Sequence, residues 1–299
     1  MKRILIAAGA VLALAAGGCS ADAEAATTAQ TGSTAVDGVR FDQKLHDMLP
    51  PGVRDRGSIR LVTDASYAPM EQFAADGRTI VGFEPDLADA LGSVLGIKVE
   101  MVAGDFQTAL DRVADGTYDG VMSAMNDTPE RQKKADFVNY FSAGTSIIVQ
   151  KGNPKGIAEL TQLCGQVVAT EKGTLQAELL ERSQPVCGTR PMTINRYNTN
   201  ADALLQLRTG RAAAVLNDYP AAAHLASDSR TRAYFQLASA AQYEPGLFGI
   251  PFAKGNTQLR DAVRAALDQL ITTGAYGDLL QRWGLGSGAV ASATINGVH

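Results

Sequence analysis

Short apolar stretches of strand length alternate with stretches of helical periodicity along most of this 299-residue chain. Residues 59–63 form an apolar run, and residues 85–95 place Leu87 and Leu91 on one helical face before Gly96 ends the pattern. The other elements predicted in this first series are strands at 98–102 and 120–123 and a helix at 105–113. Such alternation predicts an α/β fold in which helices cover both faces of a parallel sheet.

A second series of the same kind runs from about residue 167 to residue 236. Its predicted strands are 166–170, 192–197 and 213–216, and its predicted helices are 175–182, 200–209 and 220–226. After the turn signal at residues 244–246 the chain continues with an apolar run at 247–253 and helices at 256–272 and 276–283. Helices that follow the second series must pack somewhere, so two domains joined by two crossovers are the economical layout. With 45% of its residues apolar, the chain can bury two cores.

The first residues indicate export. Lys2 and Arg3 precede an apolar run of about 13 residues, which is shorter than the roughly 20 residues that a membrane span needs. Small residues then lead to Cys19 and resemble a bacterial lipobox, although Ala16 stands where that pattern prefers a larger aliphatic residue. We therefore expect residues 1–18 to be a lipoprotein signal peptide and Cys19 to be lipidated; a secretory signal cleaved elsewhere is the alternative. Two acyl chains would anchor the protein stably to the outer face of the cell membrane.

The segments beside the two series are poor in large apolar residues. Residues 20–35 are rich in Ala, Thr, Ser, Gly and Gln, so we expect a flexible tether within a lead-in at 19–54, and a loosely held C-terminal tail at 285–299. Without residues 1–18 the chain has 25 basic and 31 acidic residues, a net charge of about −6. That balance disfavours nucleic acid as a partner.

Two cysteines remain after Cys19. An even pair in an exported protein predicts a disulfide between Cys164 and Cys187, although two buried free thiols are the alternative. Closing a loop of about 23 residues is worth roughly 3 kcal/mol in the chain-entropy model. The three histidines are His46, His224 and His299, and they share no ligand spacing. We therefore expect no metal site and no cysteine–histidine chemistry.

Six short motifs occur in an order that is typical of one family. They are VTDASYAPME at 62–71, VGFEPDLA at 81–88, TPER at 128–131, DF at 136–137, KGTLQ at 172–176 and GAY at 274–276. Together they resemble the family 3 extracellular solute-binding proteins, which are the amino-acid receptors of ABC importers. The likeness spans residues 59–283. It implies no cofactor and a monomer.

The resemblance also implies a periplasmic-binding-protein type II fold, in which two α/β lobes are joined by two hinge strands. Lobe 1 would combine residues 55–141 with 246–284, and lobe 2 would comprise residues 146–241. The hinges would lie near residues 141–145 and 241–246. The ligand would lie in the cleft between the lobes, at the carboxyl ends of the strands.

Arg131 is the most informative candidate residue. It stands in the predicted first turn of a helix, where main-chain N–H groups and the guanidinium fork both favour a carboxylate. The resemblance assigns Arg131 to the α-carboxylate of an amino acid and Asp218 to its α-ammonium group. Because these residues would come from opposite lobes, they would clamp the zwitterion on closure. A solvated surface arginine and a helix N-cap are the alternatives.

The remaining binding residues follow from the same resemblance. Ser123, Ala124 and Asn126 would face the head group of the ligand, with Ala124 offering only main-chain atoms. Leu175 stands where the family often has threonine and would offer its N–H, next to Thr174. Tyr67 and Phe106 would sandwich the ligand side chain.

Carboxylates dominate the predicted specificity pocket. Asp64 and Glu71 would lie at its far end on lobe 1, and Glu171 on the wall of lobe 2. Several carboxylates around one side chain are costly unless a cation offsets them. We therefore expect a polar or basic amino acid, with arginine or lysine favoured. In the alternative, Asp64 and Glu71 hold loop backbone and Glu171 faces water.

These expectations describe a non-enzymatic receptor that delivers an amino acid to a membrane permease and its ATPase. One alternative is an enzyme of the same fold, a dehydratase that acts on cyclic acids. The other is a ligand-sensing module for a signalling partner.

Overall fold

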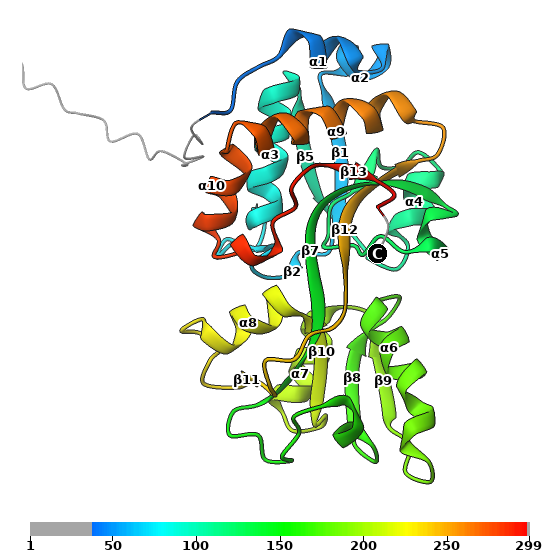
Figure 1. Ribbon diagram of the computed structural model, residues 1–299, viewed down its shortest axis with the longest axis vertical. Helices are drawn as coiled ribbons and strands as arrows, with labels where there is room; N and C mark the ends of the chain where they lie inside the picture. The colour runs from blue at the N-terminus through cyan, green and yellow to red at the C-terminus, as the bar shows by residue number, and fades with distance from the viewer. Residues whose placement is uncertain (1–37, 298–299) are drawn as a thin grey trace, which may run out of the picture. The chain divides into compact units, whose positions relative to one another are not determined.

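The computed structural model describes residues 38–297, so the predicted signal peptide and Cys19 lie outside the described residues. The described chain forms two α/β lobes, and two long strands run from one lobe into the other (Figure 1). They are β7 (Ala135–Gln150) and β12 (Tyr243–Ala253), which pair antiparallel with each other. The predicted two-lobed α/β fold is confirmed. A register shift between Tyr243 and Gly246 falls in the predicted hinge at 241–246, whose role stays a prediction.

The sheet of lobe 1 follows the alternation in the sequence. β1 (Ser58–Thr63) lies between β5 (Lys98–Ala103) and β6 (Gly120–Val121) and pairs parallel with both. β12 pairs antiparallel with β6. The loops that follow β1, β5 and β6 therefore leave the sheet at one edge, where ligands bind in open α/β sheets.

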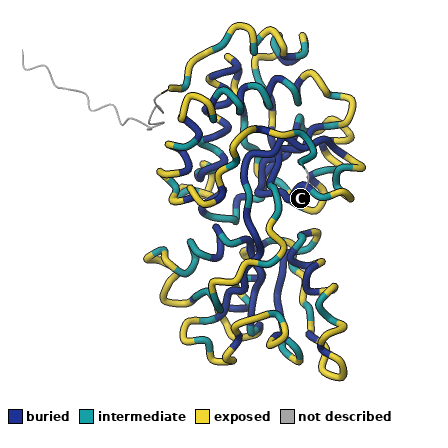
Figure 2. The backbone as a smooth tube through the Cα atoms, viewed as in Figure 1, coloured by how far each residue is buried: buried dark blue, intermediate teal, exposed yellow. Residues whose placement is uncertain are grey.

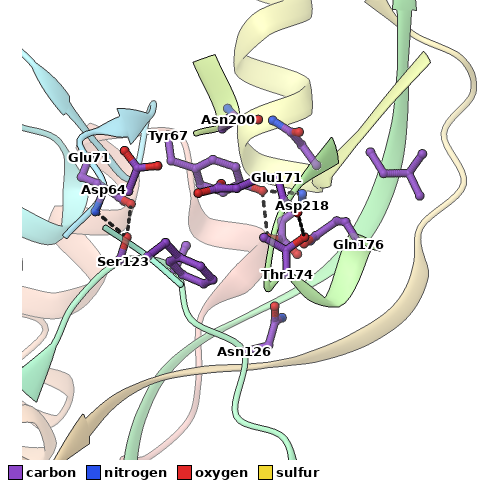
Figure 3. Close-up of a pocket in the computed structure, with 14 residues that line it drawn as sticks. Asp64, Tyr67, Glu71, Ser123, Asn126, Glu171, Thr174, Gln176, Asn200 and Asp218 are labelled. Carbon is purple, nitrogen blue, oxygen red and sulfur yellow. Dashed lines mark hydrogen bonds between the residues drawn. The ribbon is translucent and has the colours of Figure 1, made fainter. Parts of the chain in front are cut away.

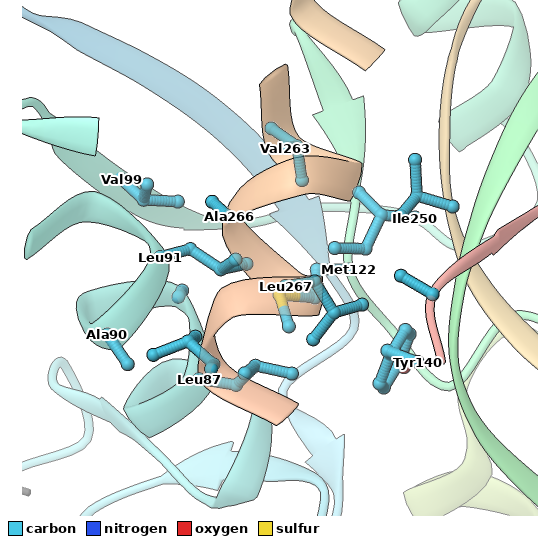
Figure 4. Close-up of a cluster of buried hydrophobic side chains, with 14 of the residues drawn as sticks. Leu87, Ala90, Leu91, Val99, Met122, Tyr140, Ile250, Val263, Ala266 and Leu267 are labelled. Atoms are coloured by element: carbon cyan, nitrogen blue, oxygen red, sulfur yellow. The ribbon is translucent and has the colours of Figure 1, made fainter. Parts of the chain in front are cut away.

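Three helices pack against this sheet and enclose the larger core. They are α3 (Phe83–Leu95), α9 (Thr257–Thr272) and α10 (Ala275–Arg282). The core between sheet and helices includes Leu87, Leu91, Met122, Ile250, Val263 and Leu267 (Figure 4). Burial of each such side chain is worth about 1.5–3 kcal/mol, so the apolar spacing of the sequence fixes which helix faces turn inward. Figure 2 shows this burial concentrated on the central strands and the inner helix faces.

The remaining elements of lobe 1 are short. A small antiparallel sheet contains β2 (Ser66–Tyr67), β3 (Glu71–Phe73) and β4 (Ile80–Val81), and it places Tyr67 opposite Glu71. The predicted helix at 105–113 begins later, as α4 (Ala109–Ala114), because Asp105 accepts the Thr108 N–H and closes a turn first. Part of the expected lead-in folds onto this lobe as α1 (Gln43–Met48) and α2 (Pro51–Arg56), which bury Leu49 and Val53.

Lobe 2 contains the second α/β series. Its sheet has the order β7, β10 (Ala214–Asp218), β8 (Val167–Glu171) and β9 (Thr193–Tyr197), and β11 (Phe235–Leu237) pairs with β7. The helices are α6 (Leu175–Ser183), α7 (Asn200–Arg208) and α8 (Tyr219–Ser227). The predicted disulfide between Cys164 and Cys187 is present. Cys164 follows the short 3-10 helix Leu160–Leu163, and Cys187 is the last residue of the 3-10 helix Gln184–Cys187.

The C-terminal segment is packed against lobe 1, so the expectation of a loose tail is wrong over residues 285–297. β13 (Thr294–Ile295) pairs antiparallel with β7 after a 3-10 turn at Gly286–Gly288. The buried side chain of Asn139 on β7 accepts hydrogen bonds from Thr294 Oγ1 and from the Gly297 N–H, both at 2.9 Å. The small residues of this segment suggested a loose tail, but they allow its main chain to pack closely against lobe 1. A Cβ at Gly288 would lie 2.0 Å from the Phe141 ring.

Candidate ligand-binding site between the lobes

A cavity lies between the lobes (Figure 3). Ten residues predicted from the sequence line it: Asp64, Tyr67, Glu71, Phe106, Ser123, Ala124, Asn126, Glu171, Thr174 and Asp218. Three of the four carboxyl groups among them sit where parallel strands end, since Asp64 follows β1, Glu171 ends β8 and Asp218 ends β10. Both lobes thus present their strand ends to one space.

Asp218 is joined to Tyr67 of the opposite lobe. The phenol of Tyr67 donates to Asp218 Oδ2 at 2.9 Å and accepts the Asp218 N–H at 2.7 Å. The other carboxyl oxygen, Oδ1, is buried and makes no hydrogen bond with the described residues. Burial raises the pKa of Asp218 to about 7, against the opposing effects of Tyr67, Gln176 and Arg131. A ligand cation at Oδ1 would restore the charged form.

Arg131 lies in α5 (Pro129–Gln132), where Thr128 caps the helix by accepting the Arg131 N–H. Its guanidinium donates to the Asn126 carbonyl at 2.7 Å and, across the cleft, to the Gly173 carbonyl at 2.9 Å. It also lies over the Phe106 ring, 5.6 Å from the ring centre. Burial lowers the pKa of Arg131. In this arrangement Arg131 is not among the residues that line the cavity, because its fork is turned to backbone carbonyls.

Ser123 and Ala124 are held from behind by two buried glutamates. Ser123 Oγ accepts the Asp64 N–H and donates to Glu71 Oε1, both at 3.0 Å. The Ala124 N–H donates to Glu84 Oε1 at 2.7 Å, and the phenol of Tyr140 donates to the same oxygen. The Ala124 N–H is therefore already bonded and is not offered to a ligand, contrary to expectation. Ala124 adopts a positive φ of 44°, a conformation that this bond supports.

Glu71 and Glu84 form a carboxyl pair without exposed surface. Burial raises the pKa of both groups, and the charge of Glu84 raises that of Glu71 further. Two carboxylates so placed cannot both ionise, so the pair keeps a proton. Glu71 reaches the cavity wall, yet its bond to Ser123 makes it a support for the loop after β6.

Asp64 and Glu171 form a second carboxyl pair, across the cleft. Burial raises the pKa of both, to about 9 for Glu171, and the charge of Asp64 and a hydrogen bond with it raise the Glu171 value further. Ser66 Oγ donates to Asp64 Oδ2 at 3.1 Å, whereas Glu171 Oε1 has no hydrogen-bond partner among the described residues. The expected alternative, a Glu171 that faces water, is wrong because only 9% of this residue is exposed.

α6 starts at Leu175 as predicted, but the residue of its first turn that lines the cavity is one position later than expected. Thr174 caps the helix by accepting the Ala177 N–H, and its hydroxyl donates to the Glu171 carbonyl at 2.8 Å. Leu175 does not line the cavity, whereas Gln176 does. Asn200, Leu216 and Asn217 also line the cavity and were not predicted from the sequence. Gln176 lies inside the KGTLQ motif and Asn217 directly precedes Asp218, but only helix phase and strand pleat decide which neighbour points inward.

Asn200 adds a third contact between the lobes. Its amide at the start of α7 donates to the Ser66 carbonyl of lobe 1 at 3.3 Å. With the bonds of Tyr67 to Asp218 and of Arg131 to Gly173, this contact holds the two walls of the cavity together. The cleft is thus formed by residues that meet only when the lobes approach each other.

The family model of the bacterial extracellular solute-binding proteins, family 3, matches residues 59–286. The chain belongs to this family. Its members include an arginine-binding protein, ArgT, of Corynebacterium glutamicum, which is 29% identical over 257 residues, 85% of this chain and 83% of the relative. Other relatives are named as ABC transporter proteins that bind arginine or glutamine, and as an L-cystine-binding protein.

Two solved structures of family-3-like proteins superpose on this chain. An ancestral arginine-binding protein bound to arginine gives a TM-score of 0.70 at 29% identity and covers 76% of this chain and 98% of its own. The ancestral amino acid-binding protein AncCDT-1, a precursor of cyclohexadienyl dehydratase, gives 0.69 at 32% identity, with coverage of 78% and 97%. These likenesses agree with the two-lobed fold described above. Within residues 38–297, no helix is both long and apolar enough to cross a bilayer.

Proposed function

We propose that this protein is an extracytoplasmic receptor that binds a free amino acid between its lobes, prefers a basic side chain, and delivers it to an ABC importer. The observation that carries the proposal is the distribution of buried polar atoms without partners on the cavity wall. Asp218 Oδ1, Glu171 Oε1 and Glu71 Oε2 are carboxyl oxygens, whereas Asn126 Nδ2 and Asn217 Nδ2 are amide donors. Buried polar atoms are normally hydrogen-bonded, so these atoms define where a ligand supplies donors and an acceptor.

The α-carboxylate fits beside Asn126. The guanidinium of Arg131 donates to the Asn126 carbonyl at 2.7 Å, so the two residues lie together at one end of the cavity. The guanidinium of Arg131 can donate two parallel hydrogen bonds to a carboxylate, and Asn126 Nδ2 can donate one more. The α-ammonium then goes to Asp218 Oδ1 on lobe 2, and the zwitterion spans the cleft.

The preference for a basic side chain rests on charge. The cavity lining contains four carboxyl groups and, among the described residues, no lysine, arginine or histidine. The α-ammonium of the ligand pairs with Asp218, and Glu71 is hydrogen-bonded to Ser123 within lobe 1. Asp64 and Glu171 are left for the side chain, and buried carboxylates are retained when a cation pairs with them. The relatives named for arginine support the same preference.

The transport role follows from family membership and from the relatives named as ABC transporter proteins. We extend the proposal to a monomer that is anchored through a lipid on Cys19, with a permease and its ATPase as partners. We further propose that it has no enzymatic activity, since its named relatives are binding proteins. The AncCDT-1 likeness keeps a dehydratase as the second candidate, because a protonated Glu171 could act as a general acid.

Thermal-shift screening of the purified mature chain tests the function. The panel comprises the common amino acids, citrulline, dipeptides and prephenate-like cyclic acids. A ligand at 100 times its dissociation constant stabilises the fold by about 2.7 kcal/mol, which raises the melting temperature visibly. We expect arginine or lysine to stabilise most. Stabilisation by cyclic acids alone would replace the receptor with the dehydratase.

A further inference from the structure

The carboxyl groups of Asp64 and Glu171 meet at the cavity wall although they belong to different lobes. Asp64 follows β1 in lobe 1, and Glu171 is the last residue of β8 in lobe 2. Both line the same cavity, where Glu171 Oε1 is buried without a hydrogen-bond partner among the described residues, and the charge of Asp64 raises the pKa of Glu171. Approach of the lobes therefore creates this pair.

The acidic groups around the pair make a doubly ionised pair more costly, and the two nearby cations are bonded elsewhere. Asp105, in the loop after β5, acts on both carboxyl groups, and Asp202 of α7 acts on Asp64. Tyr67 of β2 is affected by both Glu171 and Asp218, and it adds a phenol rather than a cation. Lys172, the residue after Glu171, is turned away and donates to Asn198 at 2.8 Å. Arg131 is bonded to the carbonyls of Asn126 and Gly173.

One proton on the pair, or one cation between the two carboxylates, relieves the repulsion between Asp64 and Glu171. Two like charges in a buried site do not both ionise unless a positive charge compensates them. A proton shared by the two carboxyl groups leaves the pair with one negative charge. A guanidinium or ammonium that donates to two carboxylates leaves the same total. Both arrangements are equivalent in charge, so a ligand side chain can exchange with the proton.

We infer that the closed cleft holds one proton between Asp64 and Glu171 when the bound side chain is neutral, and that a cationic side chain expels it. The O–H bond of the Glu171 carboxyl breaks, the proton leaves to solvent, and the side chain donates to the two carboxylates in its place. The inference rests on the proposed function and goes beyond it, because it states how basic and neutral amino acids are distinguished. Glu171 is then a specificity-determining residue.

The pH dependence of this selectivity follows from linkage. The arginine complex contains one proton fewer than the complex of a neutral amino acid. The ratio of the two affinities therefore rises about tenfold per pH unit over the range in which the pair keeps its proton beside a neutral side chain and has none beside the cation. Because the ratio compares two complexes, it does not depend on how open the protein is before binding.

Titration calorimetry with L-arginine and L-citrulline tests the inference. Citrulline has the length and shape of arginine but a neutral ureido group. We expect the affinity ratio to rise about 100-fold between about pH 6 and pH 8. Titrations in buffers with different ionisation enthalpies should show about one more proton released for arginine than for citrulline.

The matched variants are Glu171→Gln and, as a control, Glu181→Gln on the exposed face of α6. Glu171→Gln should give a ratio that does not change with pH, whereas Glu181→Gln should follow the wild type. If Glu171→Gln does not fold, the wild-type pH series decides alone. Binding of both ligands with a constant ratio would overturn the inference and leave the receptor function intact. Binding of no amino acid at all would overturn both.

Discussion

The phenol oxygen of Tyr67 bonds twice to Asp218, at 2.9 Å from its carboxyl oxygen Oδ2 and at 2.7 Å from its main-chain nitrogen. One hydroxyl thus connects β2 of lobe 1 with the end of β10 in lobe 2. It also leaves Asp218 Oδ1 as the oxygen that is available to a ligand. Tyr67 therefore helps to close the cleft and to aim the acceptor of the α-ammonium, in addition to the stacking role predicted from the sequence.

Replacing Tyr67 by phenylalanine should weaken amino-acid binding by about 1–3 kcal/mol, because the Asp218 N–H and Oδ2 lose their partner in the closed cleft. Calorimetry at neutral pH measures the loss. Tyr234→Phe in lobe 2 removes the same atom outside the cavity and should leave the affinity unchanged. Equal affinities for Tyr67→Phe and the wild type would show that this contact has no part in closure.

Stability of the protein without ligand should fall as the pH rises from about 5 to 9. The pKa values of Asp218 and Glu171 are raised in the folded protein, to about 7 and about 9. Their contribution to stability is therefore complete below the pKa values of the unfolded chain, near 4, and is lost as the pH rises through the folded values. Thermal melts of the wild type, Asp218→Asn and Glu171→Gln across this range measure the effect.

The two variants should divide that slope. Asp218→Asn should remove the part of the slope that ends near pH 7, and Glu171→Gln the part that continues to about pH 9. Saturating arginine should flatten the wild-type curve, because it compensates both carboxylates. A wild-type melting temperature that rises steadily from pH 5 to 9 would contradict the assigned protonation states.

The C-terminal segment should stabilise lobe 1 through Asn296. Its amide donates to Asp136 Oδ1 and its carbonyl oxygen accepts the Phe137 N–H, at 2.9 and 2.8 Å. Asn296→Ala should lower the free energy of unfolding by about 1–3 kcal/mol, since these groups lose their partners. Urea unfolding measures it, with the exposed Ser292→Ala as the control. An unfolding midpoint equal to that of the control would mean that the segment is dispensable.

The sequence predicted the two α/β series well because apolar periodicity decides which residues enter the core. The strand at 59–63 and the helix around Leu87 and Leu91 appear as β1 and α3 with small changes at their ends. β7 was predicted only as a hinge strand near residues 141–145, not over its full length. It crosses both lobes and is buried on both faces, so it lacks the alternation by which a strand is recognised.

The site was predictable in composition but not in contacts. Family motifs brought Tyr67, Asp218 and Glu171 to one cavity, yet no pattern in the sequence showed that Tyr67 bonds to Asp218 across 151 positions. Helix phase decides that Gln176 rather than Leu175 lines the cavity. A strained turn decides that the Ala124 N–H donates to Glu84 and not to a ligand. The C-terminal segment was misjudged because main-chain pairing, rather than side-chain burial, attaches it to β7.

The most direct test of the central claim is calorimetry of the mature protein with L-arginine, agmatine and 5-guanidinopentanoic acid. The three compounds share the guanidinium, but agmatine lacks the carboxylate that should meet Arg131, and the acid lacks the ammonium that should meet Asp218. The zwitterion clamp predicts that arginine binds and that each analogue loses affinity by on the order of 100-fold. Agmatine or the acid binding as tightly as arginine would contradict it.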